Sequence, residues 1–268
     1  MVRMSMNELT TYSWTFEEDV LHFANAGYAA IGVWRQKLSD FGEERGIELL
    51  RDHDLSVSNL MWAGGFTGID GRRFRESVQD AIEAIHLAAD LGSDSLIVYT
   101  GSRAGHTMNH SARICRNAIA ELIPVAESCG VNLAIEPVLE AAGGDWSFLH
   151  NLDAALGFVD QFGSANVKLA IDSYHIGMDS ICLKQLEEIA PKVAIVHLGD
   201  AKRRPRGEQN RCLLGAGVIP IADIVGALLD GGYKGYFDVE LLGEDMEGLK
   251  YHDVLTQSRT ALSQLIGV

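Results

Sequence analysis

Four short apolar runs in the second half of the chain each end on a residue that can bind a metal ion. The runs are Val131–Glu136, Val167–Asp172, Val193–His197 and Tyr236–Glu240. A run of aliphatic and β-branched residues is typical of a strand buried on both faces, so an ionised side chain at its end has to face solvent or a cation. Four such ends in succession predict one shared metal site, formed by Glu136, Asp172, His197 and Glu240.

The chemistry expected of this set is that of a hard divalent cation. Three carboxylates and one imidazole favour Mn²⁺, Mg²⁺, Co²⁺ or Zn²⁺ over copper or an iron–sulfur cluster. Such a cation stabilises the enediolate that forms when a proton moves between adjacent carbons of a hydroxy ketone. Glu136 and Glu240 are the candidate proton carriers. If they serve opposite faces of the substrate the outcome is epimerisation, and if one of them serves a single face it is aldose–ketose isomerisation.

The spacing of the four ends leaves room for a loop, a helix and the next strand between each pair. The first half of the chain shows the same succession of strand-like and helix-like segments, less clearly. Expected strands there are Val2–Met6, Ala29–Val33, Leu55–Leu60 and Ser95–Tyr99. Expected helices along the whole chain are Thr15–Ala26, Phe41–His53, Arg72–Leu91, His110–Cys129, Ser147–Phe162, Ser180–Ala190 and Ile221–Asp230. The pattern predicts eight strand–helix units.

A single (β/α)8 barrel spanning residues 1–268 fits this count, because 268 residues is an ordinary length for that fold and no linker divides the chain. In such a barrel the carboxyl ends of all strands meet on one face, which would bring the four ligands together. A doubly wound open sheet is the structural alternative. It is disfavoured because no phosphate-binding glycine fingerprint follows the first strand.

The formal net charge is −15 and the isoelectric point is near 4.9. Both oppose a nucleic-acid partner, which normally requires a basic surface. Nothing in the first residues resembles a signal peptide, and no apolar stretch approaches the length of a membrane span. We therefore expect a cytoplasmic protein that acts on a small molecule, without a nucleic-acid or membrane partner.

Several motifs together resemble the xylose isomerase-like barrel superfamily, in particular its sugar and sugar-phosphate isomerases and epimerases, typified by D-tagatose 3-epimerase and hydroxypyruvate isomerase. The motifs are Ala134-Ile135-Glu136-Pro137, Asp172-Ser173-Tyr174-His175, His197-Leu198-Gly199-Asp200 and Gly232-Tyr233-Lys234-Gly235 leading to Val239-Glu240. The similarity in order and spacing runs from about the fourth strand to the last. The first hundred residues share only the architecture.

The resemblance implies roles for individual residues. Glu136, Asp172, His197 and Glu240 would hold one divalent ion, commonly Mn²⁺, and the two glutamates would also exchange protons with a carbohydrate substrate. His175 and Arg203 would contact substrate oxygen atoms. Arg204 and Arg206 follow Arg203 closely, so the spacing leaves open which guanidinium faces the site. Members of the family often form dimers or tetramers, which makes a homo-oligomer an expectation here.

Three other functions stay open at this point. A lyase or dehydratase similar to inosose dehydratase would begin with the same proton abstraction and then expel a hydroxyl group. An abasic-site nuclease similar to endonuclease IV shares the barrel, but it needs additional metal-binding histidines, and Thr100 stands at the end of the fourth strand here. A sugar-binding barrel without catalysis would not require two metal-bound glutamates.

Overall fold

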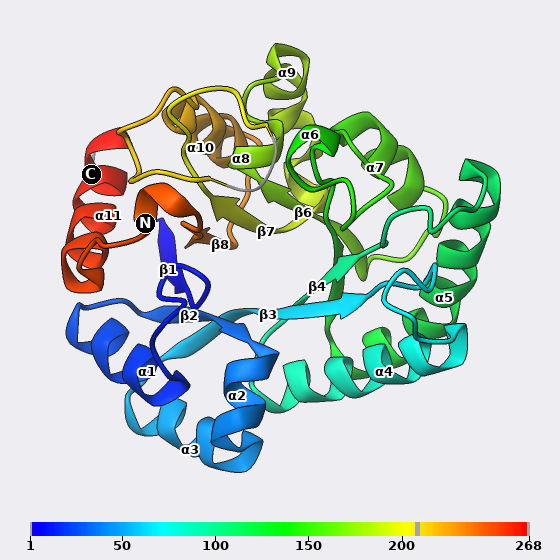
Figure 1. The fold of residues 1–268 in the computed structure, drawn as a ribbon, viewed down its shortest axis with the longest axis horizontal. Coiled ribbons are helices and arrows are strands. Elements are labelled where there is room, and N and C mark those ends of the chain that lie inside the picture. The colour runs from blue at the N-terminus through cyan, green and yellow to red at the C-terminus, as the bar shows by residue number, and fades with distance from the viewer. Residues whose placement is uncertain (1, 207–209, 267–268) are drawn as a thin grey trace.

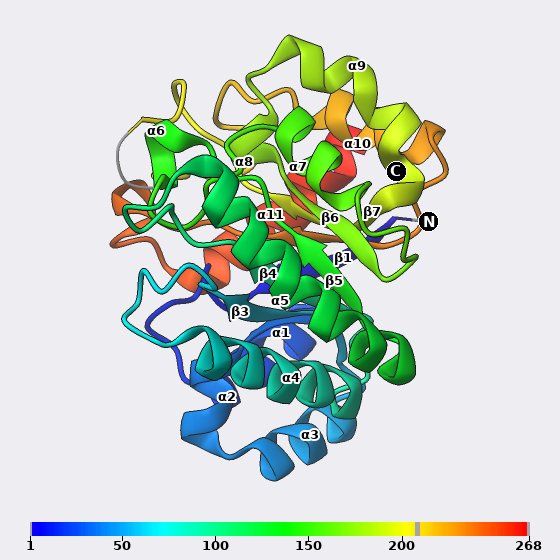
Figure 2. The ribbon, with the colours of Figure 1, turned by 90° about the vertical axis from the view of Figure 1, so that its right-hand side faces the viewer.

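The computed structural model, which describes residues 2–206 and 210–266, is a closed barrel of eight parallel strands surrounded by helices (Figures 1 and 2). The strands follow one another around the barrel in sequence order, and β1 closes it by pairing with β8. Their bounds are β1 Arg3–Asn7, β2 Ala30–Trp34, β3 Ser56–Gly64, β4 Ser95–Tyr99, β5 Asn132–Ile135, β6 Val167–Asp172, β7 Val193–Leu198 and β8 Tyr236–Val239. The predicted (β/α)8 barrel is confirmed.

The helices pack around the outside of the strands. They are α1 Phe16–Asn25, α2 Arg35–Phe41, α3 Glu43–Asp52, α4 Phe74–Asp90, α5 Met108–Cys129, α6 Glu140–Gly143, α7 Leu152–Val159, α8 Ser173–Ile176, α9 Ser180–Ile189, α10 Ile221–Asp230 and α11 Tyr251–Ile266, with 3₁₀ turns η1 Ala190–Lys192 and η2 Glu244–Met246. None of the helices in the described part of the chain is both long enough and apolar enough to cross a membrane.

Local sequence explains several helix boundaries. Thr15 and Glu18 form a reciprocal capping box at the start of α1, which satisfies amide groups that have no partner within the helix. Helix α5 ends at Gly130, whose φ of 69° is the left-handed conformation that glycine adopts without steric cost. The helices expected over Thr15–Ala26 and His110–Cys129 correspond to α1 and α5.

Three features of the structure differ from the expected helices. The helix expected over Phe41–His53 is α3, Glu43–Asp52, whereas the separate helix α2, Arg35–Phe41, which ends before Gly42 at a φ of 105°, was not expected. The helix expected from Ser147 begins at Leu152, because Ser147 instead lies 3.0 Å from the Thr100 hydroxyl and Asn151 caps the helix. Helix α11 was not expected at all; it follows the last strand and completes the outer ring.

Side chains inside the barrel come from alternate positions of the strands, as the pleat of a β-strand requires. One inward layer is apolar and consists of Met61, Ile97, Ala134, Ala170 and Ile195. The residues two positions after the last three are Glu136, Asp172 and His197, so these polar groups form the next layer toward the carboxyl ends of the strands. In Figure 2 the loops at those ends, with α6, lie on the left, and the N-terminus lies on the right.

Candidate functional site

The strand ladder fixes where each predicted ligand lies. Asp172 and His197 are direct partners in the parallel pairing of β6 and β7. Glu136 follows β5 and Glu240 follows β8. The amide of Glu240 donates to the Leu198 carbonyl at 3.0 Å, which continues the ladder beyond β8. Four segments that are far apart in sequence therefore deliver their ends to one place.

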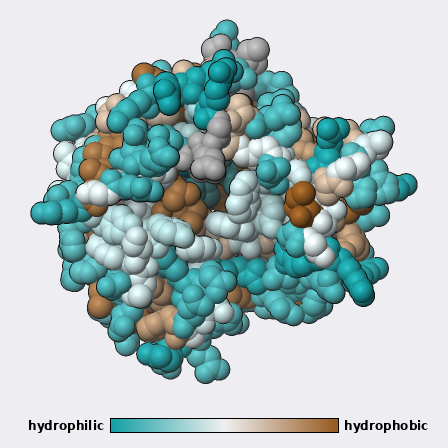
Figure 3. Space-filling model, viewed as in Figure 1, coloured by the Kyte–Doolittle hydropathy of each residue, from teal (hydrophilic) through white to brown (hydrophobic). Residues whose placement is uncertain are grey.

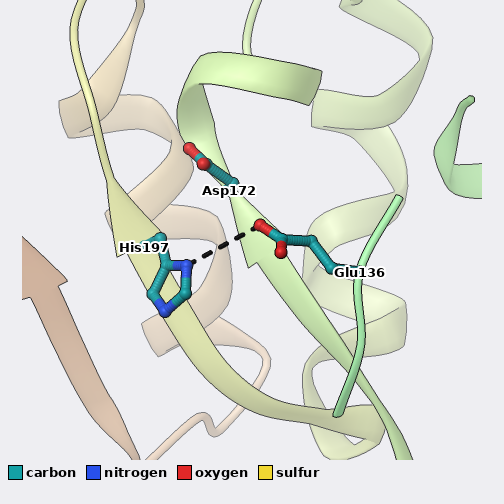
Figure 4. Close-up of side chains that lie close together, drawn as sticks. All are labelled: Glu136, Asp172 and His197. Atoms are coloured by element: carbon teal, nitrogen blue, oxygen red, sulfur yellow. Dashed lines mark ion pairs between the residues drawn. The ribbon is translucent and has the colours of Figure 1, made fainter. Parts of the chain in front are cut away.

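Glu136, Asp172 and His197 form a group whose ligand atoms lie within 4.8 Å of one another (Figure 4). The His197 Nδ1 atom is 3.7 Å from Glu136 Oε1. Glu240 approaches the same ring nitrogen, with its Oε2 atom 3.2 Å from Nδ1. The structure thus brings all four predicted residues to the His197 ring or its immediate surroundings.

A fifth charged group, Arg211, lies at the centre of this cluster and was missed in the sequence. Its Nη2 atom is 2.7 Å from Asp172 Oδ2 and 2.9 Å from Glu240 Oε1. Its Nη1 atom donates to Asp172 Oδ1 at 3.1 Å, so the guanidinium binds both oxygens of that carboxylate. Arg211 is 1% exposed. Two buried carboxylates of the site therefore share one fixed positive charge.

The charges shift the pKa values of the site residues. Burial lowers the pKa of His197, but Glu240 and Glu136 outweigh burial and raise the pKa to about 10. Burial raises the pKa of Glu240 to about 7 against the opposing effects of Arg211 and His197. Burial also acts to raise the pKa of Asp172, yet the nearby Arg211 makes the net shift downward. Without a metal ion, the imidazole is held as a cation among carboxylates.

Asp238 supports the site from inside the barrel. It accepts hydrogen bonds from Ser5 Oγ, from Asn7 Nδ2 at 2.7 Å and from Asn59 Nδ2 at 2.8 Å, and it is fully buried. Its Oδ2 atom is 3.8 Å from His197 Nε2, on the side of the ring opposite to the carboxylate ligands. The two nitrogens of the imidazole thus face acidic groups on both sides.

The two residues expected to contact substrate lie in different surroundings. His175, in α8, lines the cavity above the ligand group, and its Nε2 atom is 3.8 Å from Asp172 Oδ2. Burial lowers the pKa of His175, which favours the neutral imidazole. Arg203 is exposed in the loop after β7 and does not line the cavity. The guanidinium found at the site is that of Arg211.

A cavity of about 880 Å³ opens over the ligand group, within the range typical of small-molecule sites. Glu136, His175, His197, Arg211 and Glu240 line its floor. Aromatic side chains form a wall that comprises Trp62, Tyr99 and Trp146. In Figure 3, which views the molecule from this side, apolar and intermediate residues gather near the middle of the face inside a hydrophilic border.

The residues present fit a divalent metal ion. Both ring nitrogens of His197 are buried and lack a hydrogen bond in the described structure. Such buried polar atoms are costly unless a ligand satisfies them. Carboxylate oxygens of Glu136 and Asp172 lie around the same point, and this mixture of hard oxygen and imidazole ligands suits a divalent ion.

A signal for one of the missed residues was present in the sequence. Asp238 lies in β8, two positions before Glu240, which extends the strand ladder, so the alternation of side chains puts both on the inner face. Arg211 had no comparable local signal. It reaches the site because the loop after β7 folds back, where Cys212 pairs with Asp200 and the Arg211 amide donates to the Leu242 carbonyl at 2.9 Å.

Comparison with known families agrees with this geometry. The family model of the xylose isomerase-like TIM barrel matches residues 21–263. The chain belongs to this family. The resemblance seen in the sequence motifs is thereby confirmed, and it covers most of the first half of the barrel as well.

Individual relatives are more distant. A D-psicose 3-epimerase of Enterocloster bolteae is 33% identical over 125 residues, which is 46% of this chain and 38% of the relative. An inosose isomerase of Halalkalibacterium halodurans is 24% identical over 158 residues, 58% of this chain and 55% of the relative. These matches span about half or less of the relatives' own length. An inosose isomerase of Bacillus velezensis matches over 99% of this chain and 97% of its own, at 22% identity.

Solved structures share the fold. A protein of Sinorhizobium meliloti 1021 superposes with a TM-score of 0.87 at 24% identity, covering 98% of both chains. The IOLI protein, whose crystal structure contains a bound zinc atom, superposes with a TM-score of 0.86 at 20% identity, covering 99% of this chain and 98% of its own. The barrel architecture is therefore common to all these proteins.

Proposed function

We propose that this protein is a divalent-metal-dependent isomerase or epimerase of a keto sugar or sugar phosphate. The observation that carries the proposal is that Glu136 and Glu240 line one cavity from different strands and both lie beside His197. The named activities of the relatives, D-psicose 3-epimerase and inosose isomerase, support it. The ion would be held by Glu136, Asp172, His197 and Glu240, with Mn²⁺ as the expected metal.

A bound divalent ion would supply positive charge where negative charge develops on the oxygen atoms of a hydroxy ketone. The protein's own residues would do the rest. One glutamate removes a proton from the carbon beside the carbonyl group, and a glutamate returns it to the same or the neighbouring carbon.

The supporting residues would hold these groups in position. His175 would donate or accept a hydrogen bond with a substrate oxygen, because its Nδ1 atom is buried at the cavity and has no hydrogen-bond partner in the described structure. Arg211 would keep Asp172 ionised and would orient both Asp172 and Glu240. Asp238 would keep the His197 Nδ1 atom turned toward the ligand group.

Proton exchange tests the proposal directly. The Mn²⁺-loaded protein is incubated in D₂O with ketoses, their phosphates and cyclic ketones, and deuterium incorporation and products are followed by NMR. We expect exchange at carbon and an isomer or epimer as product. A dehydrated product would identify the lyase instead, and binding without exchange would refute catalysis of this kind.

The two glutamates provide the decisive variants. Glu136→Gln and Glu240→Gln keep a side-chain oxygen for the metal but remove the base, so each is expected to slow exchange by about 100-fold or more. Metal content is measured in parallel to separate loss of the base from loss of the ion. Glu48→Gln, at an exposed position of α3, is the matched control and should exchange like the wild type. Wild-type exchange in both metal-loaded site variants would reject the mechanism.

A further inference from the structure

The outer part of the cavity carries a group of four carboxylates, here called the acidic rim. Its members are Glu140, Asp145, Glu244 and Glu247. They come from the two loops that follow β5 and β8, and all four are exposed. Within residues 2–206 and 210–266, none of them forms an ion pair with a cationic side chain. The acidic rim therefore presents its negative charge to whatever enters the cavity.

The floor of the cavity does not compensate for this charge. Among the described residues that line it, Arg211 is the one lysine or arginine. Its guanidinium is committed to Asp172 and Glu240 at 2.7 and 2.9 Å. The three carboxylate ligands would balance Arg211 together with a divalent ion, so the floor would be neutral when loaded. The four charges of the acidic rim would then be the unbalanced charges among the described residues that line the cavity.

The other groups in the cavity suit an uncharged polyhydroxy compound. Trp146 contacts Trp62 at a ring separation of 5.2 Å and Tyr99 at 5.4 Å, and it is 43% exposed despite its size. Such an aromatic wall offers apolar faces to the C–H groups of a ligand while polar groups elsewhere fix its orientation. The Nδ1 atom of His175, a residue that is only 7% exposed, has no hydrogen-bond partner in the described structure and offers one such polar group.

From these features we propose that the acidic rim makes the enzyme selective for uncharged carbohydrates and excludes substrates that carry a phosphate or carboxylate group. The inference rests on the proposed function and narrows its substrate class. The relatives differ in the charge of the substrate in their names. Psicose and inosose are uncharged, whereas hydroxypyruvate, named for a relative from Streptomyces coelicolor, is a carboxylate. Repulsion by like charges disfavours the wrong ligand without any new contact to the right one.

The test compares matched substrates in the deuterium-exchange assay at low ionic strength. Ketohexoses are paired with their 1- and 6-phosphates, and hydroxypyruvate and an inosose are included. We expect kcat/KM for the best uncharged substrate to exceed that of its phosphates by about 100-fold or more. Raising the salt concentration should narrow this ratio, because salt screens exposed charges.

Charge reversal then identifies the residues responsible. In the double variant Glu244→Lys with Glu247→Lys, the preference for uncharged substrate should shrink by about tenfold or more. The control is Glu44→Lys with Glu48→Lys on α3, which changes the net charge equally but lies outside the cavity, and it should keep the wild-type preference.

The outcomes separate the two proposals. If phosphates or hydroxypyruvate exchange as fast as the uncharged sugars, or if the double rim variant keeps the wild-type preference, the selectivity proposal is wrong while the proposed function stands. If no compound in the panel undergoes exchange, the proposed function fails, and the selectivity proposal fails with it.

Discussion

Replacing Arg211 by methionine would remove the one positive charge that Asp172 and Glu240 share in the metal-free site. Both carboxylates are buried, at 0% and 6% exposure, so little water reaches them to replace the lost partner. Removing one partner of a buried ion pair costs about 3–5 kcal/mol of folding free energy. For a chain of 268 residues, 1 kcal/mol corresponds to about 2 °C in Tm, so the metal-free variant should melt about 6–10 °C below the wild type.

A metal ion should reverse much of this loss. In the variant, Mn²⁺ would supply the positive charge that the carboxylates lack, so it should raise the Tm of Arg211→Met by more than it raises the Tm of the wild type. Scanning calorimetry of chelator-treated and Mn²⁺-loaded samples measures both shifts. Arg211→Lys keeps the positive charge but loses the paired hydrogen bonds to Asp172. Its Tm should therefore lie between those of Arg211→Met and the wild type.

A second arginine serves as the control for this experiment. Arg75 forms an ion pair with Glu121, and its side chain is 75% exposed. An exposed pair contributes about 0–1 kcal/mol, so Arg75→Met should lower Tm by about 2 °C or less. The reasoning is refuted if calorimetry finds metal-free Arg211→Met melting within about 2 °C of the metal-free wild type. It is also refuted if Mn²⁺ raises the Tm of the variant and of the wild type by the same amount.

Two further predictions concern the metal site. Metal binding has to displace the proton from His197, whose pKa is raised to about 10, and from Glu240, whose pKa is about 7. Affinity for Mn²⁺ should therefore increase by about tenfold per pH unit between pH 7.5 and 8.5 and more steeply below pH 7, and calorimetry that finds constant affinity and no proton release would contradict this. Asp238→Asn should weaken metal binding by about 10- to 100-fold and change the tautomer of His197 in ¹⁵N NMR, whereas Asp94→Asn, at an exposed position, should do neither.

The fold and part of the site could be predicted because they follow from local patterns. Continuous apolar runs locate the strands, and the helix-like segments between them locate the helices, through interactions between near neighbours. Residues at the carboxyl ends of parallel strands must meet when those strands close into a barrel, so Glu136, Asp172 and His197 could be placed together from their positions alone. Asp238 followed the same rule, through its alternation with Glu240.

Loop contacts could not be predicted, because a long loop has no periodic pattern that fixes its path. Three arginines precede Arg211, and Arg203 had the expected spacing from His197, yet Arg203 is exposed while Arg211 enters the site. Backbone contacts that join residues 200, 211, 212 and 242 decide this outcome. The sequence by itself determined the barrel and the ligand group at its strand ends. Only the tertiary structure decided which cation neutralises that group and which carboxylates surround the cavity, because both depend on where the loops after β5, β7 and β8 pack.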